Sequence, residues 1–317
     1  MNFWLAPLHG ITNYHFRNCL ARHTQGISTA ITPFLPVQSH ERLNVKKWND
    51  ILPENNTCFF TIPQLIGNAP SHFVDTIVEL QQFGYQHFNW NIGCPAQQVV
   101  RKQRGCGLMP FPEKVEEVVE QVLTHTHCSF SVKMRLGMYS IEESYQIIQR
   151  LNNYPLDNII VHPRLGIQQY EGIPDHHYFH QVMELSKNQV IYSGDIFDGS
   201  SYQKLRQHFP KLETVLLGRG ILRNIFLAEE LTNEITIEEN RYHRFSDFYN
   251  DLSVTLLSYR SKNGALSQMK ELWHYFCVFF SLPPEELQKI LRINSWREFD
   301  GYIQELIRKS LTVNYLF

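Results

Sequence analysis

The stretch that decides the fold is NWNIGCPAQQVVRKQRGCGLM, residues 89–109. It begins with an apolar, aromatic run typical of a strand, and Asn91, Gly93, Cys94 and Pro95 then end that strand. Gly93 permits backbone angles that a side chain would forbid, and Pro95 fixes the exit, so we expect the Cys94 thiol at a strand tip. The alternative is a buried structural cysteine, because free cysteine usually behaves as a small buried hydrophobe.

The second half of this stretch is basic. Arg101, Lys102 and Arg104 precede a glycine pair that encloses a second cysteine, Cys106. A thiol beside a cationic, glycine-rich loop indicates an anionic substrate, whereas the alternative interpretation is a charge run exposed to solvent.

Working outward, eight short apolar segments recur along the chain, and most are separated by stretches with helical periodicity. Alternation of this kind requires a parallel sheet with right-handed crossovers, and eight units close a (β/α)8 TIM barrel. An open doubly wound sheet is the rival fold, but no strand-turn-helix unit carries GxGxxG. The expected strands are FWLAPL (3–8), ISTAITPF (27–34), CFFTIPQL (58–65), HFNWNIG (87–93), SFSVKMR (129–135), NIIVHPR (158–164), QVIYSGD (189–195) and TVLLGRG (214–220).

Barrel chemistry occurs where the strands end at their carboxyl side, and polar or ionisable residues stand at nearly every such end. One residue of this kind is more often a satisfied structural group, but their repetition in phase predicts a site on this face. The ends read Pro7-Leu8-His9, Thr32-Pro33, Gln64, Asn91 with Cys94, Lys133 with Arg135, His162 with Arg164, Ser193-Gly194-Asp195 and Gly218-Arg219-Gly220.

The last two strand ends indicate a phosphate. Glycines there expose backbone N–H groups, and Arg219 adds a forked donor, at the position where barrels commonly hold a phosphate. Lys133 is suited to the electron-rich edge of a flavin and Gln64 to its neutral edge. These residues alone favour a phosphorylated cofactor or substrate and leave a flavin open.

Composition narrows the class of protein. The 317 residues suit a barrel of about 250 residues plus an appendage, and no apolar run reaches the roughly 20 residues that span a bilayer. The start lacks the basic region of a signal peptide, so we expect a cytoplasmic protein with no membrane partner. The six cysteines form no CxxC pair, which favours reduced thiols and no bound metal. A net charge of −2 argues against generic binding of nucleic acid by overall charge.

Taken together, these motifs resemble the flavin-dependent tRNA-dihydrouridine synthases, and the match covers most of residues 3–230. The segment with NxGCP, a basic run and a glycine pair is the most specific element. The matching segments are APLHGITNYHFR (6–17), QLIGNAP (64–70), NIGCPAQQVVRKQRGCGLM (91–109), VKMRLG (132–137), VHPRLGIQQYEG (161–172), SGDI (193–196) and LGRGIL (217–222).

The resemblance implies reduction of the C5–C6 double bond of a uridine in tRNA, with FMN in the barrel mouth and NADPH, or NADH in its place, as the electron source. Cys94 corresponds to the general acid that protonates C5. The implied FMN contacts are Pro7, Leu8, His9, Gln64, Lys133, His162, Ser193, Gly194, Asp195, Gly218 and Arg219. The implied substrate contacts are Asn91 and Tyr170 near the target nucleotide, and the basic run with Arg101 along the tRNA.

The chain departs from the family pattern at several positions. Pro163 stands in a segment that usually reads HGRT, and Ser193 replaces an asparagine. Leu8 replaces a common methionine, and the end of the second strand lacks an acidic residue. These changes keep a catalytically impaired tRNA-binding relative open. A second alternative is a flavin barrel that acts on a small pyrimidine-like substrate, although such an enzyme needs neither a tRNA-binding domain nor the basic loop after Cys94.

Residues 241–317 are expected to form a helical tRNA-binding domain beside a catalytic barrel of residues 1–240. Asn263-Gly264 and Pro283-Pro284 are the expected breaks between its helices. Five basic residues of this region are candidate contacts to tRNA phosphates, although each of them could equally be an ordinary charge exposed to solvent. They are Arg260, Lys262, Lys270, Arg292 and Arg297. We expect a monomer.

Overall fold

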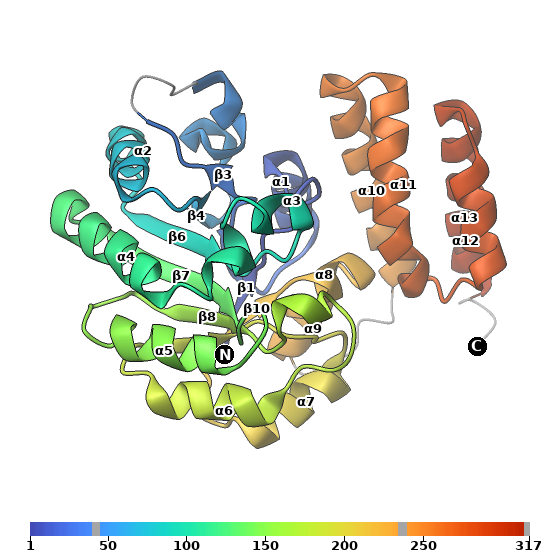
Figure 1. Ribbon diagram of the computed structural model, residues 1–317. Coiled ribbons are helices and arrows are strands. Elements are labelled where there is room, and N and C mark those ends of the chain that lie inside the picture. The colour runs from blue at the N-terminus through green and yellow to red at the C-terminus, as the bar shows by residue number, and fades with distance from the viewer. Residues whose placement is uncertain (40–44, 234–239, 314–317) are drawn as a thin grey trace.

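The computed structural model describes residues 1–39, 45–233 and 240–313. Within these residues ten strands form one sheet, and every strand pair is parallel (Figure 1). The strands are β1 (Asn2–Leu5), β2 (Ile27–Ile31), β3 (Leu35–Pro36), β4 (Phe60–Ile62), β5 (Gln64–Ile66), β6 (His87–Ile92), β7 (Ser129–Arg135), β8 (Ile159–His162), β9 (Val190–Tyr192) and β10 (Thr214–Leu217).

The sheet curls into a barrel, and the segment that carries β4 and β5 completes the ring. β4 pairs with β2, whereas β5 pairs with β6. Pro63 separates the two strands; it has no backbone N–H, but its carbonyl accepts from Asn89 N at 3.0 Å. The expected third strand is therefore one segment that changes partner at its proline, and the short β3 pairs with β5.

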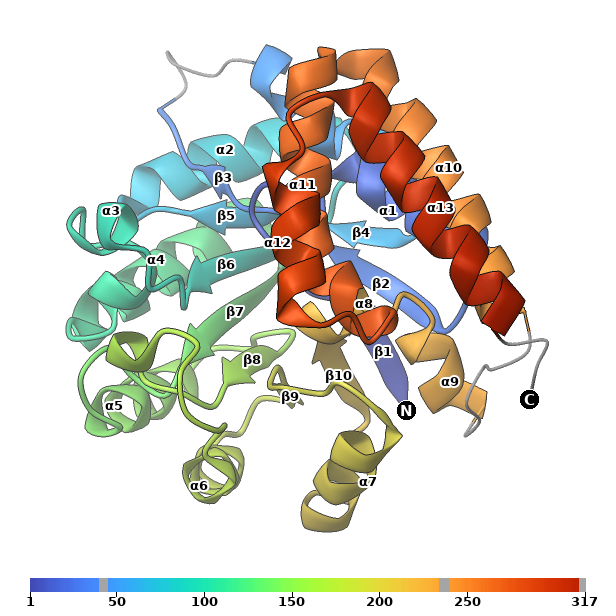
Figure 2. The same cartoon turned by 90° about the vertical axis from the view of Figure 1, so that its right-hand side faces the viewer.

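Helices follow most strands and cover the outside of the barrel (Figures 1 and 2). The α-helices of this part are α1 (Tyr14–His23), α2 (Pro70–Gln82), α3 (Gln97–Val100), α4 (Pro112–Thr126), α5 (Glu142–Leu151), α6 (His176–Leu185), α7 (Gly199–His208), α8 (Arg219–Arg223) and α9 (Leu227–Asn233). The 3₁₀ helices are η2 (Val45–Ile51), η3 (Pro53–Asn55), η4 (Gly105–Leu108) and η5 (Gly166–Gln168).

Helix α4 illustrates why these segments become barrel helices. Pro112 occupies its first turn, where the missing N–H costs nothing, and His127 ends it in the left-handed conformation. Val115, Val118 and Val122 recur at helical spacing and are fully buried against the strands. The predicted (β/α)8 barrel is confirmed.

The interior of the barrel has two chemically different parts. A small apolar cluster fills one part, and it consists of Ala6, Ile31, Ile62, Ile160, Ile191 and Leu216. In the other part, β5, β6 and β7 direct buried amide and hydroxyl groups inward, including those of Gln64, Asn89 and Ser131. The polar part lies beneath the strand ends that were expected to carry the site.

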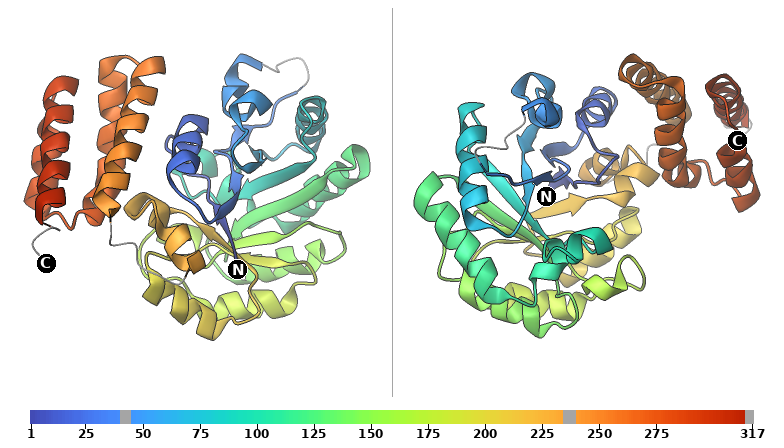
Figure 3. Two further views of the ribbon diagram at one scale, coloured as in Figure 1. Left: turned by 180° about the vertical axis from the view of Figure 1, so that it is seen from behind. Right: turned by 45° about the horizontal axis from the view of Figure 1, so that its top comes forward.

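Four helices form the C-terminal region, and they stand together on one side of the barrel (Figure 3). They are α10 (Arg241–Tyr259), α11 (Lys262–Phe279), α12 (Pro284–Arg292) and α13 (Trp296–Val313). Helix α10 packs on α1 and α11 packs on α8. Ser261 caps α11 by accepting a hydrogen bond from Gly264 N, so the break falls before Asn263-Gly264 rather than at that pair.

Large aromatic side chains make up the centre of this helical region. Phe245, Phe248, Trp273 and Phe276 are fully buried and pack edge to face at centroid distances from 5.3 to 6.5 Å.

Among the residues that the structure describes, no helix is long and apolar enough to cross a membrane.

Candidate active site

Two adjoining cavities open at the carboxyl ends of the strands. One contains Cys94 and the other contains the glycines after β9 and β10. We call the two together the cleft, because they share the lining residues Pro7, Leu8, Lys133, His162 and Tyr170. The other predicted site residues that line it are His9, Asn91, Cys94, Ser193, Gly194, Asp195, Gly218 and Arg219.

The loop that carries Cys94 is fixed by hydrogen bonds from several directions. The Asn91 side-chain oxygen accepts from the backbone N–H groups of Gly93 (3.0 Å) and Cys94 (2.9 Å). The Cys94 carbonyl accepts from Cys106 N at 3.0 Å, and the buried Cys106 thiol donates to the Gly93 carbonyl at 3.0 Å. Gly105 has φ +55°, and a Cβ there would stand 2.6 Å from the Cys94 carbonyl oxygen. The half-buried Cys94 side chain is therefore held at the strand tip, as predicted.

A chain of buried side chains supports Asn91 from below. Asn91 donates to Gln64 (2.9 Å), Gln64 donates to Asn89 (2.7 Å), and Asn89 donates to Ser131 (2.8 Å). Gln64 and Asn89 have no exposed surface. Gln64 thus lies beneath the cleft, and it reaches the cleft only through Asn91.

Lys133 presents an ammonium group to both cavities. Burial, followed by the charge of Arg135, lowers the pKa of Lys133 to about 8. Within residues 1–39, 45–233 and 240–313 no hydrogen bond or ion pair to this ammonium is found. A cation in this position favours an electron-rich or anionic group in the cleft.

His162 has both ring nitrogens engaged by the protein. The Arg164 guanidinium donates to Nε2 at 3.0 Å, so the proton resides on Nδ1, which faces the Ser193 carbonyl. Burial and the positive charges of Arg135, Lys133 and Arg164 lower the pKa of His162 well below its ordinary value. The imidazole is therefore neutral, and it presents its ring to the cleft.

Asp195 lies between two arginines. Arg164 donates to it at 2.5 Å, and Arg219 donates to its other oxygen. Burial by itself would raise the pKa of Asp195, but the hydrogen bond from Arg164 and the charge of Arg219 outweigh burial and hold this pKa below its ordinary value. Arg219 is thus already paired with a carboxylate.

Tyr170 covers the cleft from the loop after η5. Its ring lies 4.7 Å from the Arg219 guanidinium and 5.2 Å from that of Arg135, and it meets His162 edge to face. Tyr170 has 52% of its surface exposed at the mouth of the cleft. This position suits contact with an incoming substrate.

The part of the cleft at β9 and β10 is shaped by glycines. A Cβ on Gly194 would stand 2.1 Å from the Tyr192 hydroxyl, and one on Gly220 would stand 2.0 Å from the Ile196 carbonyl oxygen. The N–H groups of these two glycines have no hydrogen-bond acceptor in the part of the chain that the structure describes. Together with the Lys133 ammonium they make a donor set that fits an elongated ligand with an electron-rich ring and a phosphate.

Three predicted tRNA contacts lie outside the cleft, as their assignment to the tRNA requires, and two supporting residues were not predicted. Arg101 and Arg260 are exposed and Lys270 is half-buried, and none of the three lines the cleft. Asn89 and Ser131 were missed, although they pair in register two residues before Asn91 and Lys133. Polar residues at alternate positions of an otherwise apolar strand are the signal that would have found them.

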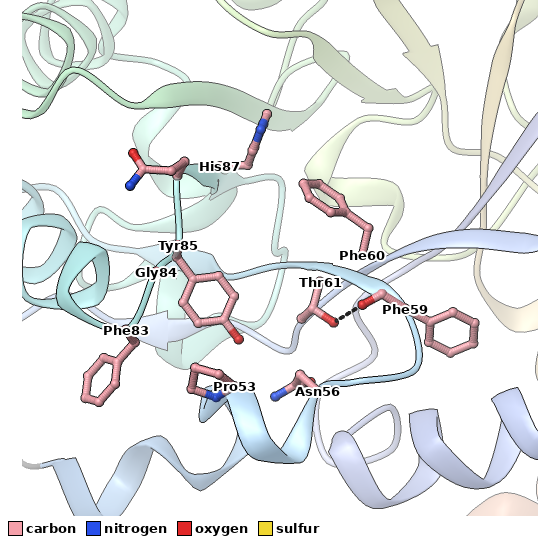
Figure 4. A pocket seen from close by; sticks show the side chains of 10 residues that line it. Pro53, Asn56, Phe59, Phe60, Thr61, Phe83, Gly84, Tyr85 and His87 are labelled. Carbon is pink, nitrogen blue, oxygen red and sulfur yellow. Dashed lines mark hydrogen bonds between the residues drawn. The ribbon is translucent and has the colours of Figure 1, made fainter.

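A separate cavity of about 440 Å³ lies at the amino ends of β4 and β6 (Figure 4). Phe60, Tyr85 and His87 line it, and the Tyr85 hydroxyl donates to the Ile51 carbonyl at 2.7 Å. Since barrel chemistry occurs at the opposite ends of the strands, we do not assign the reaction to this cavity.

Over the described residues, no group of three or more His, Cys, Asp or Glu side chains is arranged to hold a metal ion.

Comparison with known proteins identifies relatives along most of the chain. A family model described as dihydrouridine synthase matches residues 4–279. A probable tRNA-dihydrouridine synthase of Staphylococcus aureus is 25% identical over 297 residues, which cover 88% of this chain and 86% of that protein. A tRNA-dihydrouridine(16) synthase of Aquipseudomonas alcaligenes is 24% identical over 240 residues, covering 73% of this chain and 75% of that protein.

Solved structures share the fold at low identity. A variant of NCR from Zymomonas mobilis superposes with a TM-score of 0.51 at 10% identity, covering 75% of this chain and 88% of that one. Morphinone reductase in complex with tetrahydroNAD superposes with a TM-score of 0.50 at 10% identity, covering 77% of this chain and 90% of that one. These two structures bear on the architecture alone.

Proposed function

Because this chain belongs to the dihydrouridine synthase family, we propose that it reduces a uridine of tRNA to dihydrouridine, with FMN in the cleft and NADPH, or NADH in its place, as the electron source. The observation that carries this proposal is the cleft itself. It brings together the thiol of Cys94, the Lys133 ammonium and a glycine-lined end; among the described residues, neither this ammonium nor the glycine N–H groups have a protein partner.

The residues of the cleft divide between holding FMN and meeting the uridine. When bound, FMN supplies the hydride that is added to C6 of the uracil ring. Lys133 offers its ammonium to the electron-rich edge of the flavin, and Gly194 and Gly220 offer N–H groups to the phosphate. The remaining FMN contacts in the proposal are Pro7, Leu8, His9, His162, Ser193, Asp195, Gly218 and Arg219, with Gln64 acting through Asn91.

Cys94 is the proposed proton donor to C5 of the uracil ring. Its Sγ holds the proton at the tip of β6, and the hydrogen bonds that Asn91 accepts orient the loop before substrate arrives. His162 is a poor alternative acid, because Arg164 and Ser193 already engage both of its nitrogens. Tyr170 contacts the nucleotide, and Arg101, Arg260 and Lys270 contact phosphates outside the cleft.

The experiment measures dihydrouridine in tRNA for the wild type, Cys94→Ala and the control Cys58→Ala, whose side chain is exposed and outside the cleft. We expect Cys94→Ala to retain bound FMN and lose about 100-fold to 10,000-fold in turnover, since a positioned general acid contributes that much. Cys58→Ala should match the wild type.

Three outcomes contradict the proposal or parts of it. Equal turnover of Cys94→Ala and the wild type would exclude Cys94 as the proton donor. If the wild type binds tRNA but neither binds FMN nor forms dihydrouridine, the protein is a catalytically impaired tRNA-binding relative and not an enzyme of this kind. Reduction of free uracil or uridine with no activity on tRNA identifies a small-substrate enzyme.

A further inference from the structure

A further cavity of about 540 Å³ adjoins the cleft, and it lies between the barrel mouth and the end of α10. His9, Pro33 and Phe34 line both this cavity and the cleft, so the two are continuous. Tyr14, His15 and Tyr259 form its other side, where α1 meets α10. We call this cavity the aromatic groove.

The aromatic groove is lined by two pairs of parallel rings and by Tyr14, whose ring is tilted by 31° against His15 at a centroid distance of 3.8 Å. His15 stacks on Tyr259 with centroids 3.7 Å apart and an interplanar angle of 9°. His9 stacks on Phe34 with centroids 4.8 Å apart, also at 9°. Tyr259 remains 38% exposed, so part of its ring is open to a further planar group. A lining of flat rings suits a planar aromatic ligand.

The charges around the groove favour a ligand that carries phosphate. The exposed Arg260 guanidinium lies 5.4 Å from the centre of the Tyr259 ring. Asp50 is the carboxylate of the groove, and it is already occupied: Arg17 pairs with it at 3.1 Å and Tyr14 N donates to it at 2.5 Å. Burial and the charge of Arg260 lower the pKa of His15 to about 4, so this ring is neutral near pH 7.

Two amide side chains add hydrogen-bonding capacity. Asn13 uses its oxygen to cap α1, accepting from Phe16 N at 3.1 Å, and Asn49 is exposed. For the side-chain nitrogens of Asn13 and Asn49, the described part of the chain contains no acceptor. Primary amides pair with the edges of nucleobases.

We propose that the aromatic groove binds an unpaired nucleobase of the tRNA next to the target uridine. This inference rests on the proposed function, and it adds a second base-binding site to the cleft. An enzyme that acts on a base must take it out of the stack, which also leaves its neighbour unstacked. Because His15 is already in contact with both Tyr14 and Tyr259, the exposed part of the Tyr259 ring is the surface that receives this base, and Arg260 meets its phosphate.

The experiment compares equilibrium binding of a tRNA transcript to the FMN-loaded wild type, Tyr259→Ala, Tyr259→Phe and Phe60→Ala. Tyr259→Ala should weaken binding by about 5-fold to 150-fold, the range expected for the stacking of one base. Tyr259→Phe keeps the ring and loses only the long hydrogen bond to Gln268 (3.3 Å), so it should bind like the wild type. Phe60 is an exposed ring in the cavity at the opposite end of the barrel (Figure 4), and Phe60→Ala should leave tRNA binding unchanged.

A second transcript with an abasic residue on the 5′ or the 3′ side of the target uridine identifies the ligand. If the groove holds that base, a transcript that lacks it should bind the wild type and Tyr259→Ala with equal affinity. Unchanged binding by a folded Tyr259→Ala variant overturns the inference, even where the wild type forms dihydrouridine. A higher KM for NADPH with unchanged tRNA binding also overturns it, because the groove would then hold the adenine of the nicotinamide cofactor. If the proposed function itself is wrong, the wild type forms no dihydrouridine, and this result separates its failure from that of the further inference.

Discussion

Replacing Asp195 by asparagine should destabilise the ligand-free protein strongly, because the arginine that it neutralises is buried. Arg164 has 1% of its side chain exposed, and its other acceptors among the described residues are neutral, such as the Gly172 carbonyl at 2.7 Å. Leaving one charge of a buried pair without its partner costs about 3–5 kcal/mol. An asparagine oxygen still accepts one hydrogen bond, so we expect about 3 kcal/mol, the lower end of this range.

Asp251→Asn is the matched control, because Asp251 pairs with Arg22, whose side chain is 48% exposed, and with His23, so that its replacement leaves no buried guanidinium without a partner. Exposed pairs of this kind contribute about 0–1 kcal/mol. The assay is thermal and urea unfolding near pH 7; at about 2–4 °C per kcal/mol, Asp195→Asn should lower Tm by about 6–12 °C and Asp251→Asn by less than about 4 °C. Equal shifts for the two variants would refute the argument from burial.

The pH dependence gives a second test of the same pair. The folded pKa of Asp195 lies below the ordinary value of 3.8, so its stabilising contribution is fully present above that value. It is lost as the pH falls through the lower folded pKa. The difference in stability between the wild type and Asp195→Asn should therefore shrink in acid, and a difference that grows as the pH falls would contradict the assignment.

Two further substitutions test the floor of the cleft. Lys133→Met should weaken FMN binding by about 10-fold to 150-fold, as expected for loss of one hydrogen bond to a charged group, measured by flavin fluorescence titration. Because the folded pKa of Lys133 is lowered to about 8 from 10.5, the unfolded chain binds more protons between these values. The ligand-free wild type should gain stability across that interval and Lys133→Met should not. Asn89→Ala leaves the Gln64 amide without its acceptor and should cost about 1–3 kcal/mol in urea unfolding, whereas a cost near zero would exclude the buried chain as a support for Asn91.

The sequence predicted the barrel because alternation of strands and helices is a local signal, visible in periodicity and in the glycines and prolines at segment ends. The change of partner at Pro63 was not visible, because pairing with β2 on one side and β6 on the other depends on segments distant in sequence. The break between α10 and α11 was misplaced for a different reason. Asn263-Gly264 is a good turn sequence, but the cap formed by Ser261 places this pair inside the first helical turn.

The cleft was predicted in outline for the same reason, since the carboxyl ends of parallel strands meet on one face. Depth within the barrel was not predictable from strand position alone. Gln64 ends β5, but Asn91 stands between it and the cleft. Side-chain partners were also hidden: Arg219 was expected to be available to a phosphate, whereas the fold pairs it with Asp195. Pairing across 24 residues cannot be read from either motif alone.

The cleft and the aromatic groove differ in rigidity in a way that fits their proposed roles. Cys94 sits on a loop whose backbone is bonded to Asn91, Cys106 and Arg135, so the position of its thiol is set before any ligand binds. A general acid gains from such preorganisation, because small displacements of a reacting group reduce its rate contribution. Tyr170 and Tyr259 are instead partly exposed, with 52% and 38% of their surface accessible. Under the proposed function these two exposed rings would meet the tRNA, whereas the bonded loop would keep Cys94 at a set distance from the base that is reduced.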